Sequence, residues 1–240
     1  MKRKVVFLLA LVLALTPLFS INDSLKVFDT KEWLELEEVI KCNKERSIVD
    51  PVYSSYIKSD ITDFEKARAE YLYARYLADN DYKDEAKEHL EYNKNYVDSM
   101  DKSNEILNLI AQIDYSSAKT YIGKDYLGAG LENSNLTKEA IKKYPDEAYF
   151  IVTNGWRLIY TPQIAGGSNK NAIKGLEHIL KEIDNISISN KYSAYGVLAT
   201  AHFNRKDYKE SKEYLDLAFD IYYGEPPLLE LERDLEKKLK

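Results

Sequence analysis

From Thr30 onward, apolar residues recur at the spacing of an α-helix, and the polar–apolar alternation of strands is absent at useful length. The period is clearest over residues 191–224, where two apolar stripes flank a short polar turn at residues 204–207. The first stripe comprises Tyr195, Leu198, Ala199 and His202, and the second comprises Tyr208, Ser211, Leu215, Ala218 and Tyr222. This mixture of small and large residues predicts two antiparallel helices that pack closely.

A second pair of helices is predicted over residues 64–98. Thr62 and Glu65 have the spacing of a capping box, which marks the start of a helix. The two stripes that follow are Tyr73, Ala74 and Leu77, and then Ala86, Leu90 and Val97. The turn between them, residues 80–83, contains the same Asp-Tyr-Lys run as residues 207–209. The chain therefore repeats one helix–turn–helix unit.

Two less regular pairs lie between these units. The first is predicted to start at Ser103, to break at residues 128–130 and to resume as a helix over residues 136–144. The second starts at Asp146, and its two helices are joined by a longer segment, residues 161–168. Its stripes are Ala148, Tyr149, Val152, Trp156 and Ile159, and then Ala172, Ile173, Leu176, Ile179 and Leu180. We expect Tyr73, Trp156, Leu176, Leu198 and Leu215 to be buried.

Residues 191–224 resemble the tetratricopeptide repeat (TPR) in the order of their residue types. A leucine and a small residue come first, followed by an Asp-Tyr turn, a small residue, a large residue and an alanine. The resemblance implies an all-α, right-handed solenoid of antiparallel helix pairs with a concave groove. We assign residues 62–225 to TPR-like repeats, residues 21–61 to an N-terminal helix (31–44) and linker, and residues 226–240 to a capping helix. The 161–168 segment is similar to one in secreted TPR-like proteins, including the periplasmic T-component associated with TRAP transporters.

The N-terminus has the layout of an export signal. Lys2, Arg3 and Lys4 precede an apolar run from Val5 to Leu15, which is too short to span a bilayer comfortably. We expect a signal peptide over residues 1–20, with an uncleaved N-terminal anchor as the alternative. The protein is therefore expected to be exported, to the periplasm or the extracellular space, and to touch the membrane only if this segment is retained.

Composition and motifs argue against catalysis and nucleic-acid binding. A net charge of −6 does not favour a basic nucleic-acid face. Cys42 is the single cysteine, and His89, His178 and His202 are spread over three predicted helices without metal-site spacing. No phosphate-binding loop or nucleophile motif is present in the sequence. We therefore predict no enzyme activity, no cofactor and no metal.

Candidate binding residues lie on stripes that helix packing does not need. After Pro145, the stripe opposite the core is Glu147, Phe150, Asn154 and Arg157, and the first unit offers Arg68, Tyr71 and Arg75. Arginine suits carboxylates, and asparagine suits a peptide backbone. We also expect the long join to contribute: Pro162 ends the helix abruptly, Gly166 and Gly167 allow a close backbone approach, Ser168 caps the next helix, and Tyr160 supplies an apolar surface. A solvated face and a purely structural loop are the alternatives.

Two functions fit this pattern. The first is a non-catalytic module that binds a peptide or a protein partner of the cell envelope through its concave groove. The alternative is a periplasmic accessory of a transport system that binds a small or hydrophobic ligand, which requires a cavity or an oligomeric pore. The oligomeric state stays open.

Overall fold

The computed structural model describes residues 20–123 and 125–240. Within that part the fold is all-α, with 78% helix and no strand, so the predicted fold class is confirmed at this level. The predicted signal peptide, residues 1–20, lies outside the described residues except for Ser20, and stays a prediction. No helix among the described residues is both long and apolar enough to span a bilayer.

The helices follow one another with short connections. Their bounds are α2 (Lys31–Lys41), α3 (Arg46–Ile57), α4 (Asp63–Asp79), α5 (Lys83–Ser99), α6 (Glu105–Ile122), α7 (Tyr126–Lys143), α8 (Ala148–Tyr160), α9 (Asn169–Lys181), α10 (Ile188–Arg205), α11 (Tyr208–Phe219) and α12 (Pro226–Lys238). Short 3-10 turns lie at Lys26–Phe28, Gln163–Ala165 and Ile183–Asn185.

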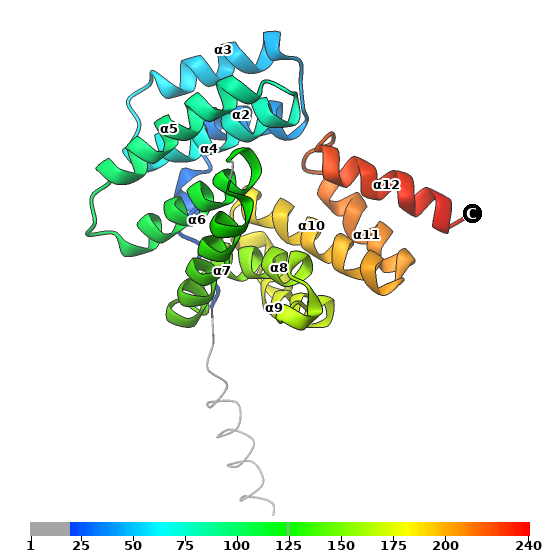
Figure 1. The fold of residues 1–240 in the computed structure, drawn as a ribbon. Coiled ribbons are helices and arrows are strands. Elements are labelled where there is room, and N and C mark those ends of the chain that lie inside the picture. Colours follow the sequence, from blue (N-terminus) through cyan, green and yellow to red (C-terminus); the bar gives the residue numbers. More distant parts are fainter. Residues whose placement is uncertain (1–19, 124) are drawn as a thin grey trace, which may run out of the picture.

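Consecutive helices pack as pairs, α4 with α5, α6 with α7, α8 with α9 and α10 with α11. The first helix of a pair also packs on the first helix of a neighbouring pair, as α4 does on α6 and α8 does on α10. In Figure 1 the helices follow an arc from α2–α5 to α10–α12, and the arc brings the start of α12 back toward α2. The first helices of the pairs therefore surround a common centre.

Local signals set several helix ends as the sequence predicts. Glu65 donates its backbone N–H to Thr62 Oγ1 (3.2 Å), and the Glu65 carboxylate accepts from the Thr62 backbone (2.9 Å), so the capping box is formed. Asn171 donates its backbone N–H to Ser168 Oγ (3.2 Å), which confirms Ser168 as the cap of α9. Each cap satisfies backbone donors that a helix leaves unpaired at its start.

The predicted break at residues 128–130 is wrong. The interruption lies at Gly123, where α6 ends, and α7 starts at Tyr126 and runs through both Gly128 and Gly130. Asp125 caps α7 by accepting from the Gly128 backbone (2.9 Å), which anchors the first turn. A glycine inside a helix costs only about 1 kcal/mol, which such a cap offsets.

The N-terminal region also differs from the expectation of one helix and a linker. The first helix, α2, ends at Lys41, and a further helix, α3, occupies Arg46–Ile57. Pro51 lies inside α3 and weakens the helical signal of the sequence there, because proline removes a backbone donor. Packing of Val49, Tyr53 and Tyr56 against the core stabilises the helix nevertheless.

Four of the five residues expected in the core are buried: Tyr73, Leu176, Leu198 and Leu215. Trp156 is an exception, because it is only half-buried and lines the central cavity described below. Its indole N–H donates to Ser193 Oγ (2.8 Å), so the ring has a polar partner that a fully apolar core would not supply.

Candidate functional site

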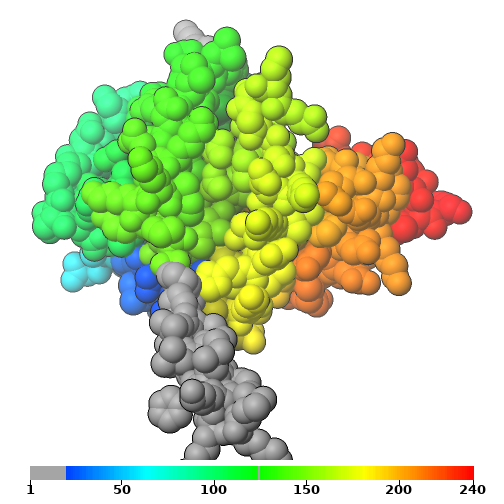
Figure 2. All heavy atoms as spheres, turned by 90° about the horizontal axis from the view of Figure 1, so that it is seen from below, coloured from blue at the N-terminus to red at the C-terminus, as the bar shows by residue number. Residues whose placement is uncertain are grey.

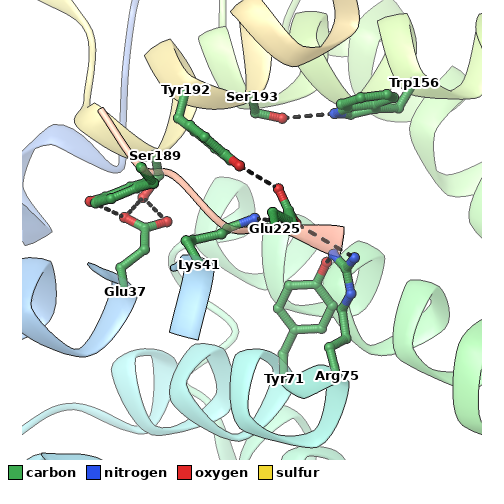
Figure 3. A network of polar contacts seen from close by, with 10 residues as sticks. Glu37, Lys41, Tyr71, Arg75, Trp156, Ser189, Tyr192, Ser193 and Glu225 are labelled. Atoms are coloured by element: carbon green, nitrogen blue, oxygen red, sulfur yellow. Dashed lines mark hydrogen bonds and ion pairs between the residues drawn. The ribbon is translucent and has the colours of Figure 1, made fainter. Parts of the chain in front are cut away.

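The centre of the arc contains a partly enclosed cavity of about 250 Å³, here called the central cavity. Its walls come from α2, α4, α6, α7, α8 and α10, and from the start of α12. Most of its lining comes from the first helices of the pairs, which is where the solenoid interpretation places a binding surface. The cavity holds charged and aromatic side chains together, as Figure 3 shows for part of its wall.

Five of the eight candidate binding residues line this cavity. They are Arg68, Tyr71 and Arg75 from α4, and Arg157 and Tyr160 from α8. Asn154 does not line it but accepts from Arg157 Nε (2.9 Å) and Nη2 (2.8 Å), so it orients that guanidinium. Gly166 and Gly167 are not among the lining residues.

Two other members of the predicted surface stripe on α8 are buried. Phe150 belongs to the apolar core between α6, α7 and α8. Glu147 precedes α8 and accepts from Ser24, through the backbone N–H (3.0 Å) and through the hydroxyl (2.8 Å). The prediction failed here because the N-terminal segment covers the start of α8, a contact over 123 residues of sequence.

The two glycines of the 161–168 segment have a local structural role. Gly166 has a φ of 95°, in the left-handed region that favours glycine. A Cβ on Gly167 would lie 1.7 Å from the Thr161 carbonyl oxygen, so no other residue fits there without a backbone shift. Ser168 then donates its backbone N–H to Leu158 O (2.9 Å), which closes the turn.

A cluster around Glu225, called the Glu225 clasp, joins the end of α2 to the start of α12 (Figure 3). Lys41 Nζ lies 3.0 Å from Glu225 Oε1, and Tyr192 donates its hydroxyl to Oε2 (2.7 Å). Arg75 Nη2 lies 3.9 Å from Oε1. Burial by itself raises the pKa of Glu225, but the charges of Lys41 and Arg75 outweigh it and hold the pKa below its ordinary value.

Gly224 allows this clasp to form. Its φ is 135°, and a Cβ there would meet the Cys42 carbonyl oxygen at 2.5 Å. The backbone of the C-terminal segment therefore lies directly against the end of α2. Glu225 is consequently held in the cavity wall by backbone contact as well as by charge.

Two further carboxylates of the cavity are tied to donors. Asp114 accepts from Arg68 Nε (3.3 Å) and from the Tyr149 hydroxyl (2.5 Å), and all three side chains are buried. Burial disfavours the charge on Arg68, but the nearby Asp114 carboxylate keeps the Arg68 pKa above its ordinary value. Glu37 accepts from Ser189 Oγ at 2.7 and 2.8 Å and from the Tyr222 hydroxyl at 3.2 Å.

Aromatic rings accompany the remaining cations. Arg75 donates to the Tyr71 hydroxyl (3.1 Å), and its guanidinium lies 5.2 Å from the centre of the Tyr121 ring. Trp156 and Tyr160 stack with ring centres 5.6 Å apart and an interplanar angle of 11°. Tyr160 is 68% exposed although it lines the cavity, so this stack lies at the cavity mouth.

Sequence reasoning missed the three carboxylates of the site and two of their partners. Glu37, Lys41, Asp114, Tyr192 and Glu225 were not among its candidates. One signal was present for Asp114, a charged residue within the apolar run of the α6 sequence. The others have partners in distant segments: Lys41 and Glu225 are 184 residues apart.

No group of three or more His, Cys, Asp or Glu residues in the described part of the chain is arranged to hold a metal ion. The chain matches no protein-family model, no curated protein and no solved structure at a significant level of similarity. Its function must therefore be argued from the central cavity itself.

Proposed function

We propose that this chain is an exported, non-catalytic binding module, built as a TPR-like solenoid, that takes a small ligand into its central cavity. The helix pairing supports the solenoid, because α4 packs on α6 and α8 packs on α10, and these four helices supply most of the cavity lining. The central cavity supports the part of the proposal that concerns a small ligand. This is the transport-accessory alternative of the sequence interpretation, and the enclosed shape of the site favours it over a peptide groove.

The size of the cavity is the observation that carries the proposal. About 250 Å³ corresponds to roughly eight water molecules at about 30 Å³ each. That is slightly below the range of about 300–1,000 Å³ typical of sites for drug-sized ligands. An extended peptide advances about 3.3 Å per residue and needs an open groove, whereas the Lys41–Glu225 contact joins two walls of this cavity.

The chemistry of the lining favours binding over catalysis. A general acid or base must reach the substrate with a usable proton or lone pair. Here Glu37, Asp114 and Glu225 each already accept two or more hydrogen bonds or ion pairs from protein groups. These carboxylates hold the helices together around the cavity.

A thermal-shift screen with a library of small metabolites tests the proposal. We expect some members to raise the melting temperature of the wild-type protein, because a ligand of the folded state stabilises it. Ser117→Trp and Thr153→Phe fill the cavity and should abolish these shifts. Ser54→Trp is the matched control, since Ser54 is equally half-buried but lies on α3 outside the cavity. Shifts that survive both cavity-filling changes contradict the proposal.

A second candidate is docking of a protein partner, and exposed apolar side chains favour it. Tyr126, Leu127 and Leu131 on α7 are exposed, and Ile164 in the 161–168 segment is 100% exposed. Figure 2 shows the start of α7 (green) and the segment after α8 (yellow-green) as two projections on the same edge of the molecule. A Leu127→Ser, Ile164→Ser double variant tests this role by partner capture from envelope extract. Lost capture with an unchanged melting temperature supports the role, and unchanged capture contradicts it.

A further inference from the structure

The cavity lining carries more positive than negative charge. Its cations are Lys41, Arg68, Arg75 and Arg157, and its carboxylates are Glu37, Asp114 and Glu225. Four cations against three carboxylates leave a surplus of one positive charge. A cavity of this kind favours an anionic ligand, because the attraction between opposite charges is stronger where water is partly excluded.

The unpaired cation of the cavity lining is Arg157. Arg68 is paired with Asp114, and Lys41 is paired with Glu225. Arg157 forms no ion pair among the described residues, and burial lowers its pKa without any compensating charge. Arg75 approaches Glu225 only at 3.9 Å.

The Arg157 guanidinium has a donor left for a ligand. Arg157 uses Nε and Nη2 on the Asn154 carbonyl, which leaves Nη1 without a hydrogen-bond partner among the described residues. Arg75 Nε is fully buried and has no acceptor among the described residues, so this atom is not a donor that a ligand in the cavity can reach. Asn154 holds the Arg157 fork in one orientation in advance of binding.

Flat apolar surfaces lie beside these donors. The stacked Trp156 and Tyr160 rings come from the same helix as Arg157, within one helical turn of it. The Tyr71 and Tyr121 rings flank Arg75. Aromatic faces of this kind accept a planar ligand body with little loss of side-chain freedom.

Resting on the proposed small-ligand function, we propose that the ligand is a small monocarboxylic acid with a planar apolar body. Its carboxylate accepts charge-assisted hydrogen bonds from the Arg157 guanidinium, with Arg75 adding a second positive charge. Its apolar part packs on the Trp156–Tyr160 stack. The Arg157–Asn154 pair determines the preference for an acid over a neutral analogue.

Four matched probes test this inference: phenylacetate, phenylacetamide, phenethylamine and acetate, each titrated calorimetrically into the full chain. We expect phenylacetate to bind about tenfold or more tighter than phenylacetamide, and phenethylamine to bind worst. Arg157→Gln should remove the acid-over-amide preference, and Arg157→Lys should restore part of it. Arg233→Gln is the control, because Arg233 is exposed on α12 and makes the same change of charge away from the cavity.

The outcomes separate this inference from the function on which it rests. Equal binding of acid and amide, or an acid preference that survives in Arg157→Gln, overturns the carboxylate assignment. The carboxylate assignment is also overturned if none of the four probes binds while library compounds still bind and Ser117→Trp abolishes that binding. In each of these cases the small-ligand function stands. If binding of every compound is indifferent to Ser117→Trp, the small-ligand function fails as well. Circular dichroism melts confirm that each variant is folded.

Discussion

The α10–α11 interface and the wall of the central cavity are built on opposite principles. Between α10 and α11, Leu198 and Leu215 are fully buried, and the Ser211 hydroxyl donates to the Ala199 carbonyl oxygen (2.7 Å). Small residues let the helices approach, and this hydroxyl finds its acceptor on the neighbouring helix. Across the cavity, by contrast, charged residues from separate helices meet around a space.

This difference separates stability from recognition. Buried apolar contact stabilises in proportion to the area removed from water. Buried ion pairs contribute little net stability, because desolvation offsets their attraction, but they are costly to break from one side. We therefore expect the α10–α11 interface to determine whether the chain folds, and the cavity wall to determine what the folded chain binds.

The largest expected effect lies in the apolar interface. Leu215→Ala should destabilise the protein by about 2–5 kcal/mol, since it removes buried methyl groups and leaves a cavity. Leu217→Ala, on the same helix but 41% exposed, should change the free energy of unfolding far less. Denaturant titration measures both. Equal stability of Leu215→Ala and the parent would show that this interface is not a packed core.

A smaller effect, and one that depends on pH, is expected at the Glu225 clasp. Glu225→Gln leaves Lys41 and Arg75 without their carboxylate and should destabilise the protein by roughly 3 kcal/mol at pH 7. Because the folded-state pKa of Glu225 is depressed, its contribution is complete above the ordinary glutamate pKa and is lost as pH falls below it.

The variant should consequently lose less stability than the parent when pH is lowered through that range. Glu230→Gln is the control, because Glu230 is exposed on α12. Thermal melts between pH 7 and pH 3 provide the comparison. Parallel pH profiles of Glu225→Gln and the parent would show that Glu225 is not a stabilising carboxylate.

The smallest effect on stability, with the largest on binding, is expected on α8. Asn154→Ala combined with Arg157→Ala should change the free energy of unfolding by less than about 0.5 kcal/mol per site, because both side chains are only half-buried and neither holds two helices together. Capture of the ligand or partner should be lost. Unchanged capture removes these residues from the site, and a large drop in melting temperature makes them part of the scaffold.

Patterns within one helix or one turn were readable from the chain. Thr62 with Glu65, and Ser168, act on backbone groups three residues away, so their caps need no knowledge of the fold. The burial of Leu198 and Leu215 likewise follows from helical spacing. Arg68, Arg75 and Arg157 were candidates because they lie on stripes that helix packing does not need and because guanidinium groups suit ligand carboxylates; all three line one cavity.

Contacts between distant segments were decided only by the tertiary structure. Helical spacing places Trp156 on a core stripe, yet the arc of the helices leaves a cavity beside it and makes it part of the wall. Phe150 is buried because apolar residues of α4, α6 and α7 form one core cluster with it. Lys41 and Glu225 meet across 184 residues because the arc returns α12 to α2, and no local pattern encodes that return. Sequence periodicity specifies which face of each helix is apolar, whereas the packing of all the helices together specifies which polar faces meet.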